Sequence, residues 1–266
     1  MIDYHLHTSR CCHATGTMEE YLGEAVKKGL KEVGFADHFP LGLLDFTPRA
    51  KVTMEPAELD EYVQDVEDLK KSFSGLQVKL GIEVDYIPGT EEKLELLLKQ
   101  YPFDYVTGSI HFMDDWDFTH PVYADTYKNR NIDELYRHYY KLVREVCLSG
   151  LFDIIGHIDV IKKFGYRPED GLQSLWDETA DLLKTTNTAI ELNTAGRDAP
   201  VGDFYPDFPF LERCFRSGVP VTLGSDAHSP GQVGRYFPEA LDLLKKAGYR
   251  EIAVFRQRKR DAISLI

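Results

Sequence analysis

The chain alternates between short apolar runs and amphipathic helical patterns along its whole length, and this alternation constrains the fold more than any other feature. The apolar runs are five to seven residues long and are bounded by turn residues, which indicates strands. Strand–helix alternation predicts a parallel sheet whose strands are joined by helical crossovers. We expect strands at 2–6, 32–37, 78–84, 104–110, 153–158, 189–193, 220–225 and 251–255, and helices that include 18–29, 55–73, 132–150 and 237–248.

Metal-competent polar residues stand at the carboxyl end of nearly every expected strand. In a closed barrel these ends meet at one mouth, whereas the outer strands of an open doubly wound sheet lie too far apart to share a site. The pattern therefore favours a barrel, although the run 251–255 carries no such residue and is expected to be irregular. The residues concerned are His5, His7, His38, Glu83, His111, His157, Asn193, Asp226 and His228.

The pair His5 and His7 is the densest part of this pattern. Side chains at i and i+2 of a strand point to the same face, so both imidazoles are directed at one point. Imidazole is a common ligand of zinc and other transition metals. A single His-x-His pair is weak support, because two half-buried strand residues would look the same. Its repetition at the ends of further strands makes a shared metal site the better interpretation.

Length and composition limit the class of protein. A chain of 266 residues suits one (β/α) barrel of about 250 residues, so we expect a single domain over 1–266. No apolar run approaches the roughly 20 residues of a membrane helix, and the start lacks the pattern of a signal peptide. The four cysteines are expected to be reduced, and the expected location is cytoplasmic. They are Cys11, Cys12, Cys147 and Cys214.

Five motifs resemble those of a known family and stand in its order: "DYHLHTSRCCHATGT", "GSIHFMDDWDF", "FDIIGHIDVIKKFG", "ELNTAGR" and "LGSDAHSP". They are similar to the polymerase-and-histidinol-phosphatase (PHP) superfamily, and within it to histidinol-phosphate phosphatases, over about residues 3–235. The resemblance implies a distorted (β/α)7 TIM-like barrel. It also implies a metal-dependent phosphoric monoester hydrolase that converts L-histidinol phosphate to L-histidinol and inorganic phosphate in histidine biosynthesis.

The same resemblance implies three divalent metal ions and assigns their ligands. Zn, Fe, Mn and Co all suit a mixed imidazole and carboxylate shell. Asp37 and the ligand Asp226 are both candidates for protonating the leaving alcohol. Carried over residue by residue, the family pattern places His5, His7, Glu83 and Asp226 on the first ion, Glu83 as a bridge to the second with His111 and His157, and His13, His38 and His228 on the third.

Charge favours a small phosphorylated substrate. Asp and Glu number 44 against 31 Lys and Arg, a net charge of -13, which argues against a nucleic-acid partner. Three divalent ions carry a charge of about +6, and two carboxylate ligands with a bridging hydroxide reduce the charge of the centre to about +3. A phosphate monoester carries about -1.5 to -2, so the centre would attract it. Paired ions can generate hydroxide and hold the attacked phosphoryl group.

Cations near the expected mouth are candidate phosphate ligands. Arg197 follows the sixth strand, and arginine binds oxyanions bidentately. Lys162 and Lys163 follow the fifth strand, but an exposed, solvated loop is an equally good interpretation for them. The loop 112–118 offers Asp114, Asp115 and Asp117 beside Phe112 and Trp116, which would suit the cationic amine and imidazole of histidinol. A solvated acidic loop is the alternative.

Three competing functions remain open at this point. A different small phosphate monoester or a nucleotide would suit the same metal centre. A non-catalytic metal-binding or nucleic-acid accessory module is disfavoured by the complete ligand set and the acidic charge. A metal amidohydrolase usually carries a bridging lysine, whereas here Glu83 occupies the bridging position. The sequence predicts no particular oligomeric state.

Overall fold

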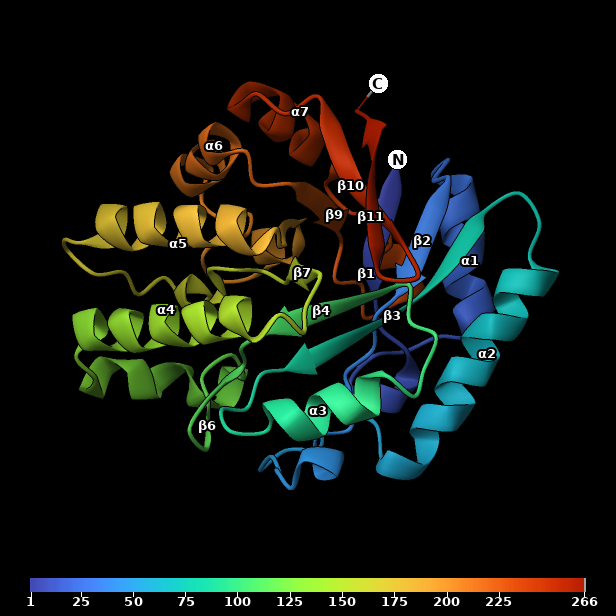
Figure 1. Ribbon diagram of the computed structural model, residues 1–266, viewed down its shortest axis with the longest axis horizontal. Helices are drawn as coiled ribbons and strands as arrows, with labels where there is room; N and C mark the ends of the chain where they lie inside the picture. The colour runs from blue at the N-terminus through green and yellow to red at the C-terminus, as the bar shows by residue number, and fades with distance from the viewer. Residues whose placement is uncertain (266) are drawn as a thin grey trace.

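Seven parallel strands form a nearly closed barrel surrounded by helices in a computed structural model that describes residues 1–265 (Figure 1). Ile266, the last residue of the expected domain, lies outside the described residues. The order of the strands follows the chain, so each helical crossover joins neighbours in the barrel. The predicted α/β barrel is thus confirmed. Its strands are β1 (Ile2–Leu6), β2 (Glu32–Phe35), β3 (Gln77–Asp85), β4 (Tyr105–Ser109), β7 (Ile154–Ile155), β8 (Ala189–Asn193) and β9 (Val221–Gly224).

The barrel closes between β1 and the segment that follows β9. The amide of His7 donates to the carbonyl of Ala227 at 3.0 Å, and the amide of Ala227 donates to the carbonyl of His5 at 3.1 Å. Ala227 stands between Asp226 and His228 in the sequence. Closure of the barrel therefore brings metal-competent residues from both ends of the chain side by side.

Helices cover the outside of the barrel, and most of them end where the sequence predicts. Gly150, Gly218 and Gly248 take the left-handed conformation after three of these helices, which is the conformation that glycine adopts most easily. The helices are α1 (Met18–Lys27), α2 (Leu59–Ser72), α3 (Glu91–Leu98), α4 (Ile132–Ser149), α5 (Leu172–Thr186), α6 (Phe208–Ser217) and α7 (Phe237–Ala247).

The run expected as an eighth strand is extended but does not join the barrel. It forms β10 (Glu251–Arg256), which pairs antiparallel with β11 (Lys259–Ser264). Phe255 packs against the aromatic rings of Tyr4 and Tyr105, at centroid distances of 6.3 and 6.2 Å. At the turn of this hairpin, the amide of residue 258 donates to the carbonyl of residue 104, which directly precedes β4. The hairpin thus covers the amino-terminal mouth of the barrel (Figure 1).

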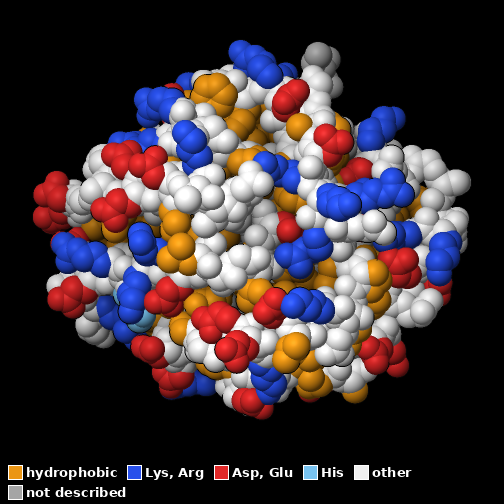
Figure 2. Space-filling model, in the orientation of Figure 1, with side chains coloured by type: hydrophobic (Ala, Val, Ile, Leu, Met, Phe, Trp, Pro, Cys, Tyr) orange, Lys and Arg blue, Asp and Glu red, His pale blue; other side chains and the backbone are white. Residues whose placement is uncertain are grey.

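Within residues 1–265, none of the helices combines the length and apolar character needed to cross a bilayer. Acidic and basic side chains are interspersed over the face in Figure 2, with apolar side chains in small groups between them. All four cysteines are unpaired.

Candidate metal centre

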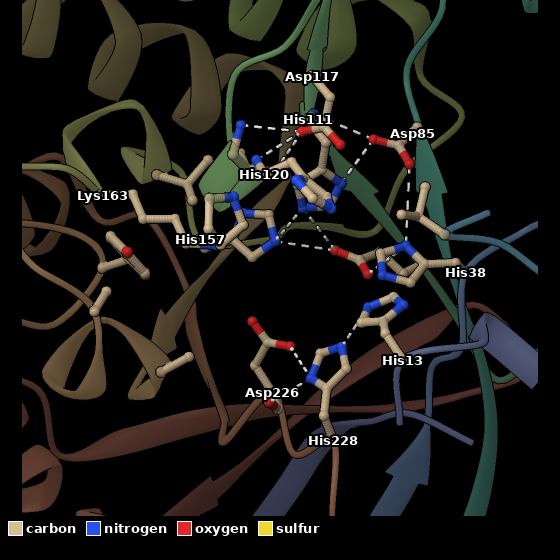
Figure 3. Close-up of a pocket in the computed structure, with 18 of the residues that line it drawn as sticks. His13, His38, Asp85, His111, Asp117, His120, His157, Lys163, Asp226 and His228 are labelled. Atoms are coloured by element: carbon tan, nitrogen blue, oxygen red, sulfur yellow. Dashed lines mark hydrogen bonds and ion pairs between the residues drawn. The ribbon is translucent and has the colours of Figure 1, made fainter. Parts of the chain in front are cut away.

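A cavity of about 510 Å³ opens at the carboxyl ends of the barrel strands. Imidazoles from several strands converge on its centre (Figure 3). Convergence of this kind follows from the barrel, because parallel strands all end at the same mouth. The polar residues that line it include His13, His38, Glu83, Asp85, His111, Asp117, His120, His157, Lys163, Asp198, Asp226, His228 and Arg235.

Glu83 lies at the middle of the cluster. Its Oε1 is 3.0 Å from Nε2 of His157 and 4.0 Å from Nε2 of His111. Its Oε2 is 3.3 Å from Nε2 of His5 and 3.1 Å from Nδ1 of His38. Each carboxylate oxygen therefore faces a different group of imidazoles, which is the arrangement that bridging two ions requires.

Asp226 extends the cluster on the side of β1. Its Oδ1 lies 3.1 Å from Nε2 of His7 and 3.9 Å from Nε2 of His5. Beyond it, Nε2 of His228 lies 2.9 Å from Nε2 of His13. The nine expected ligands thus form one continuous cluster and not three separate groups. Sets whose donor atoms all lie within 4.8 Å of one another include His5–His7–Glu83, His38–Glu83–His111 and His7–His38–His228.

These residues fit divalent metal ions. Nε2 of His5, Nδ1 of His38 and Oε2 of Glu83 are buried and have no hydrogen-bond partner among the described residues. Leaving a buried polar atom unpaired costs about 1–3 kcal/mol, so three in one cluster call for a ligand. All three face one another, and imidazole nitrogen with carboxylate oxygen is a donor set that Zn, Fe, Mn and Co accept.

Carboxylates behind the imidazoles fix which nitrogen faces the cavity. Nδ1 of His5 lies 2.7 Å from Oε1 of Glu191, and Nδ1 of His111 lies 2.7 Å from Oδ1 of Asp85. Such contacts hold the proton on Nδ1 and leave Nε2 free for a metal. Sequence reasoning missed both carboxylates. Glu191 lies two residues before Asn193 and Asp85 lies two residues after Glu83, so each shares a strand face with a predicted site residue. This spacing could have identified both carboxylates from the sequence.

Asp37 also lies behind an imidazole and does not line the cavity. It is fully buried, its Oδ1 is 3.4 Å from Nδ1 of His7, and it accepts hydrogen bonds from the hydroxyl of Thr8 and the amide of His38. A leaving alcohol in the cavity would not reach it. This position corrects the expectation of a proton donor and suits a group that orients His7.

Electrostatics keep the central carboxylates ionised in the metal-free protein. Burial raises the pKa of Glu83, but the surrounding imidazoles outweigh burial and hold this pKa well below its ordinary value. The same balance, with His5 and His7 as the cations, lowers the pKa of Asp226. In return, neighbouring carboxylates outweigh burial and raise the pKa values of His5 and His7. A metal ion that binds His5 and His7 would therefore displace protons from these imidazoles and not from the two carboxylates.

The two neighbouring lysines have opposite environments. Lys163 lines the cavity, and no carboxylate of residues 1–265 lies within ion-pair distance of its ammonium group (Figure 3). Lys162 is buried away from the cavity, where its ammonium group contacts Asp159 at 2.8 Å and Asp207 at 2.5 Å. This position does not favour the substrate contact expected for Lys162, because buried carboxylates already pair with its charge.

Two other expected substrate contacts also lie elsewhere. Arg197 is exposed, is not part of the cavity wall, and donates to the carbonyl of Gly202 at 3.0 Å. Trp116 packs under the guanidinium of Arg130, 3.6 Å from the ring centroid, and is likewise outside the cavity. The cavity instead contains Arg235, which sequence reasoning did not single out.

Comparisons with known proteins agree with this geometry. Residues 3–195 match the model of the PHP domain. The chain is 40% identical to the "probable histidinol-phosphatase" of Deinococcus radiodurans over 97% of this chain and 98% of that protein. It is 29% identical to the histidinol-phosphatase of Bacillus subtilis over 90% of this chain and 98% of that protein. The fold is similar to the crystal structure of histidinol phosphate phosphatase from Lactococcus lactis, complexed with zinc, L-histidinol and phosphate, with a TM-score of 0.82, 24% identity and 98% of each chain covered.

Proposed function

The chain belongs to the PHP domain family, among the histidinol-phosphatases, and we propose that it hydrolyses L-histidinol phosphate to L-histidinol and inorganic phosphate. This is a step of histidine biosynthesis. The observation that carries the proposal is Glu83, whose two oxygens each face a separate group of imidazoles inside an open cavity. The relatives named for this activity support it, as do the zinc, histidinol and phosphate held by the Lactococcus lactis enzyme.

We assign three divalent ions to the cluster. When bound, they would supply a bridging hydroxide at neutral pH and neutralise the phosphoryl oxygens. Glu83 would hold two of these ions, and His38, whose Nδ1 lies 3.1 Å from Oε2 of Glu83, would hold the third. The proposed ligands are His5, His7, Glu83 and Asp226 for the first ion, Glu83, His111 and His157 for the second, and His13, His38 and His228 for the third.

Lys163 is our candidate for the phosphate end of the substrate. It is half-buried and lines the cavity, and within residues 1–265 no carboxylate lies within ion-pair distance of its ammonium group. A cation in this position would bind a phosphoryl oxygen through a charge-assisted hydrogen bond. Asp226 also lines the cavity, unlike Asp37, so of the two carboxylates considered it is the one that a leaving alcohol can reach.

Asp117 is our candidate for the amine end. Its Oδ1 accepts hydrogen bonds from the amide and hydroxyl of Thr119 and from the amide of His120, which hold the carboxylate still. Its Oδ2 has no hydrogen bond from any described residue, and the side chain lines the cavity (Figure 3). Phe112, which is paired with Asp117 in a short hairpin, lines the same cavity. A fixed carboxylate with one free oxygen suits an ammonium group. Asp114 and Asp115 of the same loop do not line the cavity.

A phosphate-release assay over a panel of small monoesters and nucleotides, with Zn, Mn, Fe and Co in turn, tests this function. Histidinol phosphate should give the highest kcat/KM. Asp117→Asn should raise KM for histidinol phosphate about tenfold or more, since a charged hydrogen bond contributes about 1.5–3 kcal/mol. It should leave p-nitrophenyl phosphate unaffected, because the alcohol part of that ester carries no ammonium group. Asp115→Asn, in the same loop but exposed, is the matched control. A higher kcat/KM for another monoester would replace this substrate with the alternative phosphoesterase function.

The proposal also covers the extent of the catalytic domain and the cellular location. We treat residues 1–266 as one catalytic unit, because Asp226 and His228 lie beyond the residues that match the PHP domain and yet belong to the same cluster. The four unpaired cysteines fit a reducing compartment, so we propose a cytoplasmic location.

A further inference from the structure

We propose that Arg235 is a positioning residue that holds two metal ligands, Asp226 and His228, in place. Arg235 lies on the loop between β9 and α7, nine residues after Asp226. Its Nε donates to the carbonyl of Ser225 at 3.0 Å, and its Nη2 donates to the carbonyl of Asp226 at 2.9 Å. The guanidinium thus clamps the turn that carries both ligands. This inference rests on the metal centre proposed above.

The turn needs such a clamp because its backbone is strained. Asp226 has a φ of 52°, in the left-handed region that non-glycine residues seldom adopt. Conformations of this kind cost of order 1–3 kcal/mol and persist only where the surroundings hold them. The carbonyl of Asp226 accepts from Arg235 and also lies 3.1 Å from Nδ1 of His228. One carbonyl group therefore connects the clamp to a ligand of the first ion and a ligand of the third.

Arg235 is itself anchored on both sides of the barrel mouth. Its Nη1 donates to Oδ2 of Asp198 at 2.9 Å, and Asp198 belongs to the short helix η6 (Ala195–Asp198) after β8. On the opposite side, the buried carboxylate of Asp3 accepts from the amides of Ser225 at 2.8 Å and Gly234 at 2.9 Å. Asp3 of β1 thus fixes both ends of the segment Ser225–Gly234, and Arg235, the next residue, fixes the same segment to η6.

Three groups of its own chain occupy this arginine, which separates its role from that of Lys163. An arginine that serves mainly as a substrate ligand would keep its donors for the cavity. Here Nε, Nη1 and Nη2 each donate to an oxygen of the chain, which uses three of the five N–H groups and fixes the plane of the guanidinium. Groups that orient metal ligands typically contribute a factor of 10–100 to metal affinity.

The test is a competition titration of metal-free protein with zinc against a chromophoric chelator, which needs no substrate. Arg235→Ala should weaken zinc binding by about 10–100-fold. Arg260→Ala is the matched control, because Arg260 also donates to a carbonyl and a side-chain oxygen, those of Asn187, but lies on β11 at the far mouth. This control should bind zinc like wild type. Arg235→Lys, which cannot contact both carbonyls and Asp198 together, should fall between wild type and Arg235→Ala.

The outcomes separate this inference from the proposed function. If Arg235→Ala does not fold, Arg235→Lys decides: weaker zinc binding supports the clamp, and wild-type binding overturns it. Wild-type zinc affinity in a folded Arg235→Ala protein, even with a lowered Tm of the metal-free form, would overturn it as well and leave only a structural role. Failure of the wild-type protein to bind zinc would instead remove the metal centre itself, and the inference with it.

Discussion

The carboxylate of Glu191 lies 2.7 Å from Nδ1 of His5, although the two residues are 186 positions apart in the chain. The other oxygen of Glu191 accepts from the amide of His157 and the side chain of Asn193, both at 2.9 Å. Glu191 thus connects three strand ends around the centre without facing the cavity. Its contact with His5 holds the ring so that Nε2 points to Glu83.

Glu191→Gln should therefore weaken metal binding by about 10–100-fold and lower turnover with it, because the amide orients His5 less firmly than the carboxylate. Elemental analysis after dialysis against a weak chelator measures the loss. Gly224→Ala provides an independent route to the same effect, since a methyl group at Gly224 would overlap Oε1 of Glu191. Full metal occupancy in both variants would show that the Glu191–His5 contact does not support the metal centre.

Glu83→Gln should remove the proposed bridge. An amide has one oxygen to offer where the carboxylate has two, so the variant should lose metal content and nearly all turnover. The barrel should remain folded by circular dichroism, because only one atom changes in the side chain. Normal activity with full metal content would contradict the bridging assignment.

His13→Ala should release one metal ion and lower kcat, whereas Cys12→Ala should change little. Nε2 of His13 faces His228 at 2.9 Å, and Nδ1 is 2.8 Å from the carbonyl of Cys11, which fixes the ring. Cys12 is exposed and its side chain points to the carbonyl of Arg10. Metal content per chain and kcat are measured for both variants. A larger loss in Cys12→Ala than in His13→Ala would mean that sulfur coordinates a metal ion here.

The neighbouring lysines should separate stability from catalysis. Lys162→Met leaves the buried carboxylate of Asp159 without its cation, while Asp207 keeps Arg167. The free energy of unfolding should therefore fall by about 3–5 kcal/mol, the usual cost of an uncompensated buried charge. Lys163→Met should keep its stability and lower kcat/KM by roughly tenfold to a hundredfold through loss of one charged hydrogen bond to phosphate. Urea unfolding and steady-state kinetics give the two readouts. An unstable Lys163 variant with normal kinetics would refute the proposed phosphate contact.

Metal binding should strengthen as pH rises towards 9. Burial lowers the pKa of His111, but the carboxylate of Asp85 outweighs burial and raises this pKa to about 9 in the metal-free protein. Below that pH the proton competes with the metal, so each unit of decreasing pH weakens binding about tenfold through this group alone. Asp85→Asn should move the bend in a plot of log affinity against pH to lower pH. A bend at the same pH in both proteins would exclude Asp85 as the cause.

The sequence by itself determined the barrel and the set of residues that meet at its mouth. Strand–helix alternation leaves few topologies, and in a barrel every strand end reaches the same mouth. Position along the chain was therefore enough to bring His5, His157 and Asp226 into one cluster.

Only the tertiary structure decided which side chains outside that set face the cavity. Lys163 lines it and Lys162 does not, Asp117 lines it and Trp116 does not, and Arg235 lies in its wall where Arg197 was expected. The physical reason is that adjacent residues in a strand or turn point in different directions. In a loop, the direction of each side chain depends on backbone angles such as those of Asp226, and on partners far away in sequence, such as Asp207 for Lys162.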